Sequence, residues 1–113
     1  MATKHSTLEN GIGLVEPGGS LIGGKETDDL RRVITDFVSR EYSKLLVDLS
    51  AVTYLNSTAI GVLVSALATY SRKGWQIKLC GVNKNIDSIF VITKLSLAFD
   101  VHDTRKEALA TFT

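Results

Sequence analysis

The chain has little proline, cysteine and histidine, and these shortages exclude several classes of protein. Its 113 residues include one proline, one cysteine and two histidines. Because Cys80 is alone, it cannot form an internal disulfide, which excludes a disulfide-stapled secreted domain and favours a reducing, cytoplasmic setting. Two separated histidines and one cysteine provide no cluster with the spacing of a metal site. We therefore expect neither a metal nor another cofactor.

The chain also lacks an excess of charge of one sign and a long hydrophobic run. Thirteen basic and twelve acidic residues leave a net charge of +1, which argues against direct binding of nucleic acid, since that requires a concentrated basic face. The longest apolar run, residues 59–68, is shorter than the roughly 20 residues that cross a bilayer. The first ten residues have no apolar signal-peptide core. We expect no membrane insertion.

Alternating strand and helix patterns predict a single α/β domain over residues 1–113. The expected elements are an edge strand within 4–9, a hairpin turn at 10–11, a strand over 12–16 that resumes at 20–22, a helix from 27, a strand over 45–47, a helix whose periodic pattern begins at 59, a strand over 75–80, a helix over 84–95, a short strand at 99–101 and a helix from 105. This order indicates a mostly parallel central sheet, an antiparallel N-terminal edge hairpin and about four helices. Residues 1–6 are expected to be a flexible terminus.

The central stretch of the chain places a serine at the start of a helix. The apolar run 45–47 is typical of a strand that is covered on both faces. Residues 51–55 are interpreted as a loop that leads to Asn56 and Ser57, either of which can cap the helix that follows. The expected core face of this helix comprises Ile60, Leu63, Val64 and Leu67. A serine hydroxyl is thus expected at the carboxyl edge of the sheet, where function usually lies in open α/β folds.

A second side of the same helix is also apolar. It carries Ala59, Val62, Ala66 and Thr69. One interpretation is a central helix packed on two sides. The other is an exposed apolar strip beside the serine, which marks a docking surface. The sequence leaves both open.

Several motifs, in this order and spacing, resemble the signature of one known family. Asp48-Leu49-Ser50 ends the apolar strand, Tyr54-Leu55 follows, and Asn56-Ser57-Thr58-Ala59-Ile60-Gly61 opens the helix. The flanking segments 19–21, 74–79 and 106–109 are similar to the family pattern too. The chain resembles STAS domains, and specifically the small, free-standing anti-sigma-factor antagonists. The resemblance covers nearly the whole chain from Asn10 onward.

The resemblance implies a regulatory function. It places the phosphate acceptor at Ser57 and implies a partner that is both anti-sigma factor and serine kinase, together with a serine phosphatase that resets the protein. Unphosphorylated protein would bind the partner and release the sigma factor, and phosphorylated protein would let it go. The implied partner-binding residues are Asn56, Ser57, Thr58, Ala59 and Val62. The sequence leaves open whether the protein also forms a weak homodimer.

The sequence departs from the family pattern at three positions. Asn56 stands in place of an acidic residue, Ala59 in place of a glycine, and Ile22 where an aspartate often occurs. The loss of two acids leaves a second function open within the same fold, namely a STAS scaffold or transport-assembly subunit without phosphorylation.

A serine hydrolase is the alternative from another class. A serine at a strand-to-helix turn resembles a nucleophile elbow, and His102 with Asp48 or Asp103 would complete a triad. However, residues 55–59 lack the glycines of the G-x-S-x-G turn, which such a strained turn requires. We therefore do not expect an enzyme, and we assign no catalytic residue.

Overall fold

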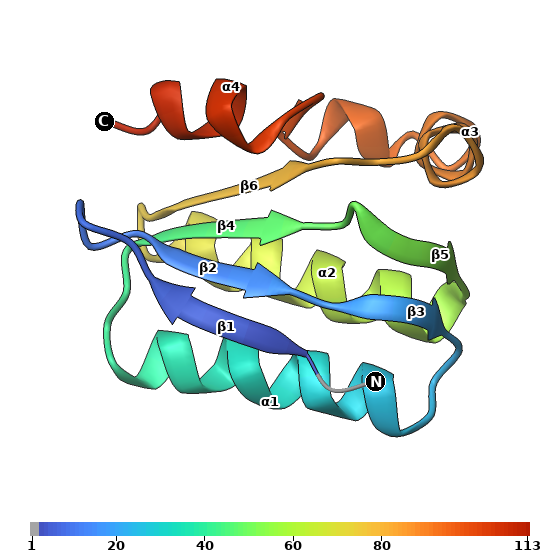
Figure 1. Ribbon diagram of the computed structural model, residues 1–113, viewed down its shortest axis with the longest axis horizontal. Coiled ribbons are helices and arrows are strands. Elements are labelled where there is room, and N and C mark those ends of the chain that lie inside the picture. Colours follow the sequence, from blue (N-terminus) through green and yellow to red (C-terminus); the bar gives the residue numbers. More distant parts are fainter. Residues whose placement is uncertain (1–2) are drawn as a thin grey trace.

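Two sheets and four α-helices make up the part of the chain that the computed structural model describes, residues 3–113 (Figure 1). The elements in chain order are β1 (Lys4–Thr7), β2 (Gly13–Glu16), β3 (Gly18–Leu21), α1 (Lys25–Ser39), β4 (Lys44–Asp48), β5 (Ala51–Leu55), α2 (Ser57–Arg72), β6 (Gln76–Cys80), α3 (Lys84–Ile92), the 3-10 turn η1 (Leu95–Leu97), β7 (Val101–His102) and α4 (Arg105–Ala110). The predicted α/β class is confirmed.

The main sheet has the strand order β1-β2-β4-β6-β7. The β1–β2 pair is antiparallel, and every other pair in this sheet is parallel. The turn between β1 and β2 closes where the Leu8 amide donates to the Ile12 carbonyl, 2.9 Å away, and Gly11 has φ +72° there. The mostly parallel sheet and the N-terminal antiparallel hairpin are therefore as predicted.

The second sheet is the parallel pair β3–β5. Figure 1 shows that β3 and β5 continue the paths of β2 and β4 beyond the main sheet. The interpretation of residues 51–55 as a loop is wrong, because they form β5. Local pattern alone did not indicate this strand, since only Val52 and Leu55 of its five residues are buried. The strand with which it pairs lies 33 or 34 positions earlier in the chain.

The larger core lies on the face of the main sheet covered by α1 and α2. Strand residues alternate between the two faces, so Leu45 and Val47 of β4 point to this core. α1 contributes Leu30, Val33, Ile34 and Phe37, whose spacing places them on one face of the helix. It begins at Lys25 rather than the expected Thr27; the Thr27 hydroxyl is buried and accepts from the Gly23 amide at 2.9 Å.

A smaller core lies on the opposite face, under α4. It comprises Ile12, Leu14, Leu46, Cys80 and Ala108. Thr104 caps α4, because its hydroxyl accepts from the amide of Glu107 at 3.1 Å. Because α4 covers β6, Lys78 and Cys80 of that strand are buried on this face.

Two chain segments differ from the expected elements. Lys4–Ser6 were expected in a flexible terminus, but they lie in β1 and pair with β2; residues 1 and 2 lie outside the described residues. The helix expected over 84–95 ends at Ile92, because Lys94 adopts the left-handed conformation that separates α3 from η1. No helix within residues 3–113 is long and apolar enough to cross a membrane.

Candidate functional site

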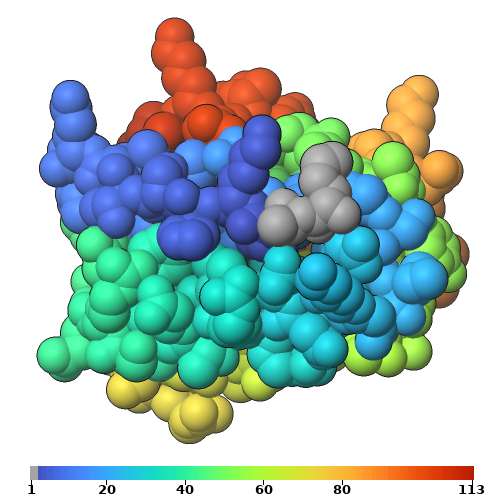
Figure 2. All heavy atoms as spheres, turned by 60° about the horizontal axis from the view of Figure 1, so that its bottom comes forward, coloured from blue at the N-terminus to red at the C-terminus, as the bar shows by residue number. Residues whose placement is uncertain are grey.

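The candidate site lies where the loop after β3 meets the beginning of α2. In the β3–β5 pair, Leu21 is opposite Leu55, and the Asn56 amide donates to the Leu21 carbonyl at 3.0 Å. Figure 2 shows the light-blue residues of this part of the chain beside the green ones that lead into α2. The parallel pair therefore carries the β3–α1 loop and the α2 start to one place.

Asn56 caps α2, as one of the two expected cap residues. Its side-chain oxygen accepts from the Ala59 amide at 3.1 Å, and its carbonyl accepts from the Ile60 amide at 3.0 Å. A short polar side chain at this position satisfies a backbone N–H that has no partner inside the helix. The cap makes Ser57 the first residue of α2.

Ser57 and Thr58 are both exposed. The Ser57 hydroxyl makes no hydrogen bond to another group within residues 3–113. Thr58 lies against the β3–α1 loop, since a Cβ built on Gly23 would be 3.4 Å from the Thr58 Cβ. Both residues are therefore at the surface, and Thr58 also packs against this loop.

Two residues expected at the partner interface point inward instead. Ala59 is fully buried and Val62 is nearly so. Val62 and Ala66 face α1 across a groove of about 280 Å³, whose lining includes Ile34 and Val38. Of the two interpretations of this side of α2, the helix packed on two sides is the one that the structure has, so Ala59 and Val62 do not form an exposed docking strip.

The other side of α2, which was the expected core face, is also packed except at one residue. Leu63 is buried and Ile60 and Leu67 pack partly against the core, but Val64 is 39% exposed. The expectation that Val64 belongs to the core face is wrong. Both sides of this helix are apolar, so the periodicity alone could not tell which one faces α1.

The Asp48-Leu49-Ser50 motif has a structural role. Asp48 accepts from the Ser50 amide at 3.0 Å and from Nε and Nη2 of Arg105 at 3.0 and 2.8 Å. Burial favours a raised pKa for Asp48, but the hydrogen bonds from Ser50 and Arg105 outweigh it and hold that pKa below its usual value. Arg105 was not predicted from the sequence as the partner of Asp48. Its only local feature is its position directly after Thr104, and this does not indicate which carboxylate it will bind.

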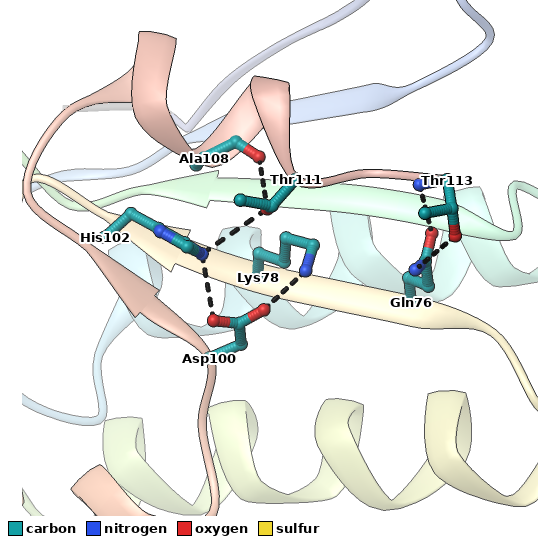
Figure 3. Close-up of polar contacts among 7 residues, drawn as sticks. All are labelled: Gln76, Lys78, Asp100, His102, Ala108, Thr111 and Thr113. Carbon is teal, nitrogen blue, oxygen red and sulfur yellow. Dashed lines mark hydrogen bonds and ion pairs between the residues drawn. The ribbon is translucent and has the colours of Figure 1, made fainter.

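His102 does not complete a hydrolase triad in the described structure. Its Nε2 lies 2.9 Å from Asp100 and 3.5 Å from the Thr111 hydroxyl (Figure 3). Asp100 also pairs with the buried Lys78, and this hydrogen bond, assisted by the charges of Lys78 and His102, lowers the pKa of Asp100. These groups join β6 and β7 to α4, and none of these interactions involves Ser57.

No group of three or more His, Cys, Asp or Glu side chains in residues 3–113 is arranged to hold a metal ion. The single cysteine is buried beneath α4, and burial raises the pKa of its thiol to about 12. A thiol with such a pKa is protonated and unreactive at neutral pH. Neither observation adds chemistry to the site around Ser57.

Comparison with known proteins gives one consistent result. The model of the family described as "STAS domain" matches residues 6–108. A protein of Thermotoga neapolitana, named "Putative anti-sigma factor antagonist TM1081 homolog", is 32% identical over 77 residues, which are 68% of this chain and 68% of that protein.

Solved structures share the fold at lower identity. The crystal structure of a Thermotoga maritima protein described in the same terms aligns with a TM-score of 0.88 at 22% identity, over 96% of this chain and 92% of that one. Bacillus SpoIIAA in its phosphorylated form aligns with a TM-score of 0.76 at 12% identity, over 96% of this chain and 97% of its own. The chain therefore belongs to the STAS domain family and groups with its anti-sigma factor antagonists.

Proposed function

We propose that this protein is a cytoplasmic regulator that sequesters a kinase-type anti-sigma factor, and that phosphorylation of Ser57 ends the complex. A serine phosphatase would then restore the binding form. The proposal is supported by the Thermotoga relative named as an anti-sigma factor antagonist and by the motif from Asp48 to Gly61. The likeness to SpoIIAA supports the fold alone.

The observation that carries the proposal is the exposed Ser57 hydroxyl at the first position of α2. The N–H groups of a first helical turn and the helix dipole favour an anion nearby. A phosphate on Ser57 would therefore be tolerated by the protein itself. Since none of the residues that position Ser57 needs to move, we expect the fold to be the same in both states.

The phosphate would weaken binding at the surface where the partner docks. Phosphorylation adds about −1.5 to −2 charges at neutral pH. An interface that fits a neutral hydroxyl would have to desolvate that charge, which costs several kcal/mol when no partner cation is present. Such a cost is enough to change a mainly bound population into a mainly free one.

The test is phosphorylation by the kinase-type anti-sigma factors of the source organism, purified and incubated one by one with ATP and this protein. We expect a mass gain of one phosphate that Ser57→Ala abolishes and Thr58→Ala leaves intact. The Thr58→Ala variant is the matched control, because Thr58 is the neighbouring exposed hydroxyl. Phosphate on Thr58 alone, or on neither residue, would contradict the proposal.

The absence of acids near Ser57 supports a second candidate function, a STAS scaffold or transport-assembly subunit without a phosphorylation cycle. The first turn of α2 has no acidic residue. In that case the protein would bind its partner with the same affinity before and after incubation with kinase and ATP. A measured affinity that falls after phosphorylation would exclude this alternative.

A further inference from the structure

We propose that the partner docks on the uncharged surface formed by Ser20, Ile22, Thr53 and Tyr54 beside Ser57, and that the partner segment seated there is apolar. We call these four residues the β3–β5 surface. The inference deepens the proposed function and rests on it, since the docked partner is the kinase-type anti-sigma factor. It assigns to Ile22 and Tyr54 a role in selecting that partner.

The first argument is the position of the β3–β5 surface. Ser20 and Tyr54 are opposite each other in the β3–β5 register, and the Ser20 hydroxyl lies 3.3 Å from that of Thr53. These three residues are exposed, whereas the next pair, Leu21 and Leu55, is buried. One side of the short sheet thus faces solvent.

Ile22 connects this side to Ser57. It lies between Leu21, whose carbonyl accepts from the Asn56 amide, and Gly23, which lies against Thr58. Both neighbours of Ile22 in the chain therefore contact the segment that carries Ser57. A partner that covers Ser57 would come within reach of Ile22.

The second argument is exposure of large apolar side chains. Ile22 is 60% exposed and Tyr54 is 47% exposed. Single exposed apolar residues are common on protein surfaces, but these two belong to the two segments that the β3–β5 pairing brings to the start of α2. Burying them against an apolar segment would favour association, and tyrosine is among the residues that contribute most at interfaces.

The third argument is charge. The β3–β5 surface and the adjoining start of α2 contain no lysine, arginine, aspartate or glutamate. Their residues are Ser20, Ile22, Thr53, Tyr54, Asn56, Ser57 and Thr58. A charged partner segment would lose water here and find no counter-charge, so the surface selects against it. A phosphate on Ser57 would then add a charge to a group of uncharged residues, which makes it an effective switch.

A second group of exposed apolar residues provides a matched control. Ile92 at the end of α3 is 79% exposed and Leu97 in η1 is 84% exposed. They are more exposed than Ile22 and Tyr54, but they lie in α3 and η1, outside the β3–β5 pair and the loop that meets the start of α2. If exposure alone decided docking, this second group would be the better surface.

The experiment measures the affinity of the unphosphorylated protein for the anti-sigma factor that phosphorylates it, by isothermal titration. We expect Ile22→Asp and Tyr54→Ser each to weaken binding at least tenfold, and Ile92→Asp and Leu97→Asp to change it less than twofold. The conservative variants Ile22→Val and Tyr54→Phe should bind nearly as the wild type does. Thermal midpoints of all variants would verify that the fold is intact.

The outcomes distinguish the two proposals. If the wild type binds and Ser57→Asp does not, but Ile22→Asp and Tyr54→Ser bind normally, the β3–β5 surface is overturned and the proposed function stands. If Ile92→Asp or Leu97→Asp weakens binding tenfold, the partner docks at α3 and η1 instead. If the wild type binds no kinase-type anti-sigma factor, both proposals fail.

Discussion

Arg105, the first residue of α4, holds Asp48, the last residue of β4, through two hydrogen bonds of 3.0 and 2.8 Å across 57 positions of sequence. The same guanidinium contacts Glu16 at the end of β2. Asp48 is buried, whereas Arg105 remains partly exposed. This connection joins α4 to two strands of the main sheet, on the face opposite α1 and α2.

Replacing Arg105 by leucine should destabilise the fold. The buried Asp48 carboxylate would keep the Ser50 amide but lose its ionic partner, and a hydrogen bond to a charged group contributes about 1.5–3 kcal/mol. Because Arg105 is partly exposed, we expect a loss of about 1–3 kcal/mol, measured by urea unfolding. Arg32→Leu is the control, since Arg32 pairs with Asp29 at the helix surface and should contribute less than about 1 kcal/mol. If both variants lost the same free energy of unfolding, the contact between Arg105 and Asp48 would contribute no more than a surface ion pair.

Stability should fall in acid because of Asp48 and Asp100. The pKa of each is lowered in the folded protein, so each contributes stability above its unfolded pKa of about 3.9. That contribution is lost as pH falls through the lower folded pKa. We expect Asp48→Asn/Asp100→Asn to be less stable than wild type at pH 6, but to lose less free energy of unfolding between pH 5 and pH 2.5. If the free energy of unfolding of the variant and of the wild type fell by the same amount over this pH range, Asp48 and Asp100 would not be the cause of the acid sensitivity.

Two glycines should respond to alanine in opposite directions. Gly81 has φ +73°, and a Cβ there would lie 2.8 Å from the Ser50 Cβ and 2.9 Å from Asp48 Oδ1. The left-handed conformation alone costs about 1–2 kcal/mol for alanine, so Gly81→Ala should destabilise by more than that. Gly61, inside α2, has no atom within 4 Å of such a Cβ, and Gly61→Ala should stabilise by about 0.5–1 kcal/mol. Thermal unfolding of both variants would test this contrast.

The cap of α2 can be tested separately from partner binding. Asn56→Ala removes the acceptor of the Ala59 amide and should cost about 1 kcal/mol. Asn56→Asp keeps an acceptor and adds a negative charge that the helix dipole favours, so its stability should equal or exceed that of wild type. Urea unfolding would measure both changes. A stable Asn56→Ala variant would mean that the cap contributes little to α2.

A negative charge at Ser57 should affect binding and leave the fold intact. Ser57 is exposed at the first position of α2, where the dipole favours an acid. We expect Ser57→Asp to keep the thermal midpoint of wild type within about 2 °C while binding of the anti-sigma factor falls below detection. A Ser57→Asp variant that unfolds would show that the effect of phosphate is on the fold.

Features that depend on near neighbours could be predicted from the sequence. The hairpin at residues 10–11, the helix from residue 27 and the Asn56 cap each depend on residues within a few positions of one another. Ser57 at the beginning of a helix was predictable for the same reason, since short polar side chains favour cap positions. Together with the motif from Asp48 to Gly61, these local signals were sufficient for the family and for the candidate acceptor.

Features that depend on distant partners required the tertiary structure. Residues 51–55 form a strand because β3 lies beside them, and Ala59 and Val62 are buried because α1 covers that side of α2. The contact of Arg105 with Asp48 and the hydrogen bond of the Asn56 amide to the Leu21 carbonyl join segments far apart in sequence. Backbone pairing and side-chain burial between such segments depend on where the chain folds back, and a periodic pattern in one segment carries no information about which partner will cover it.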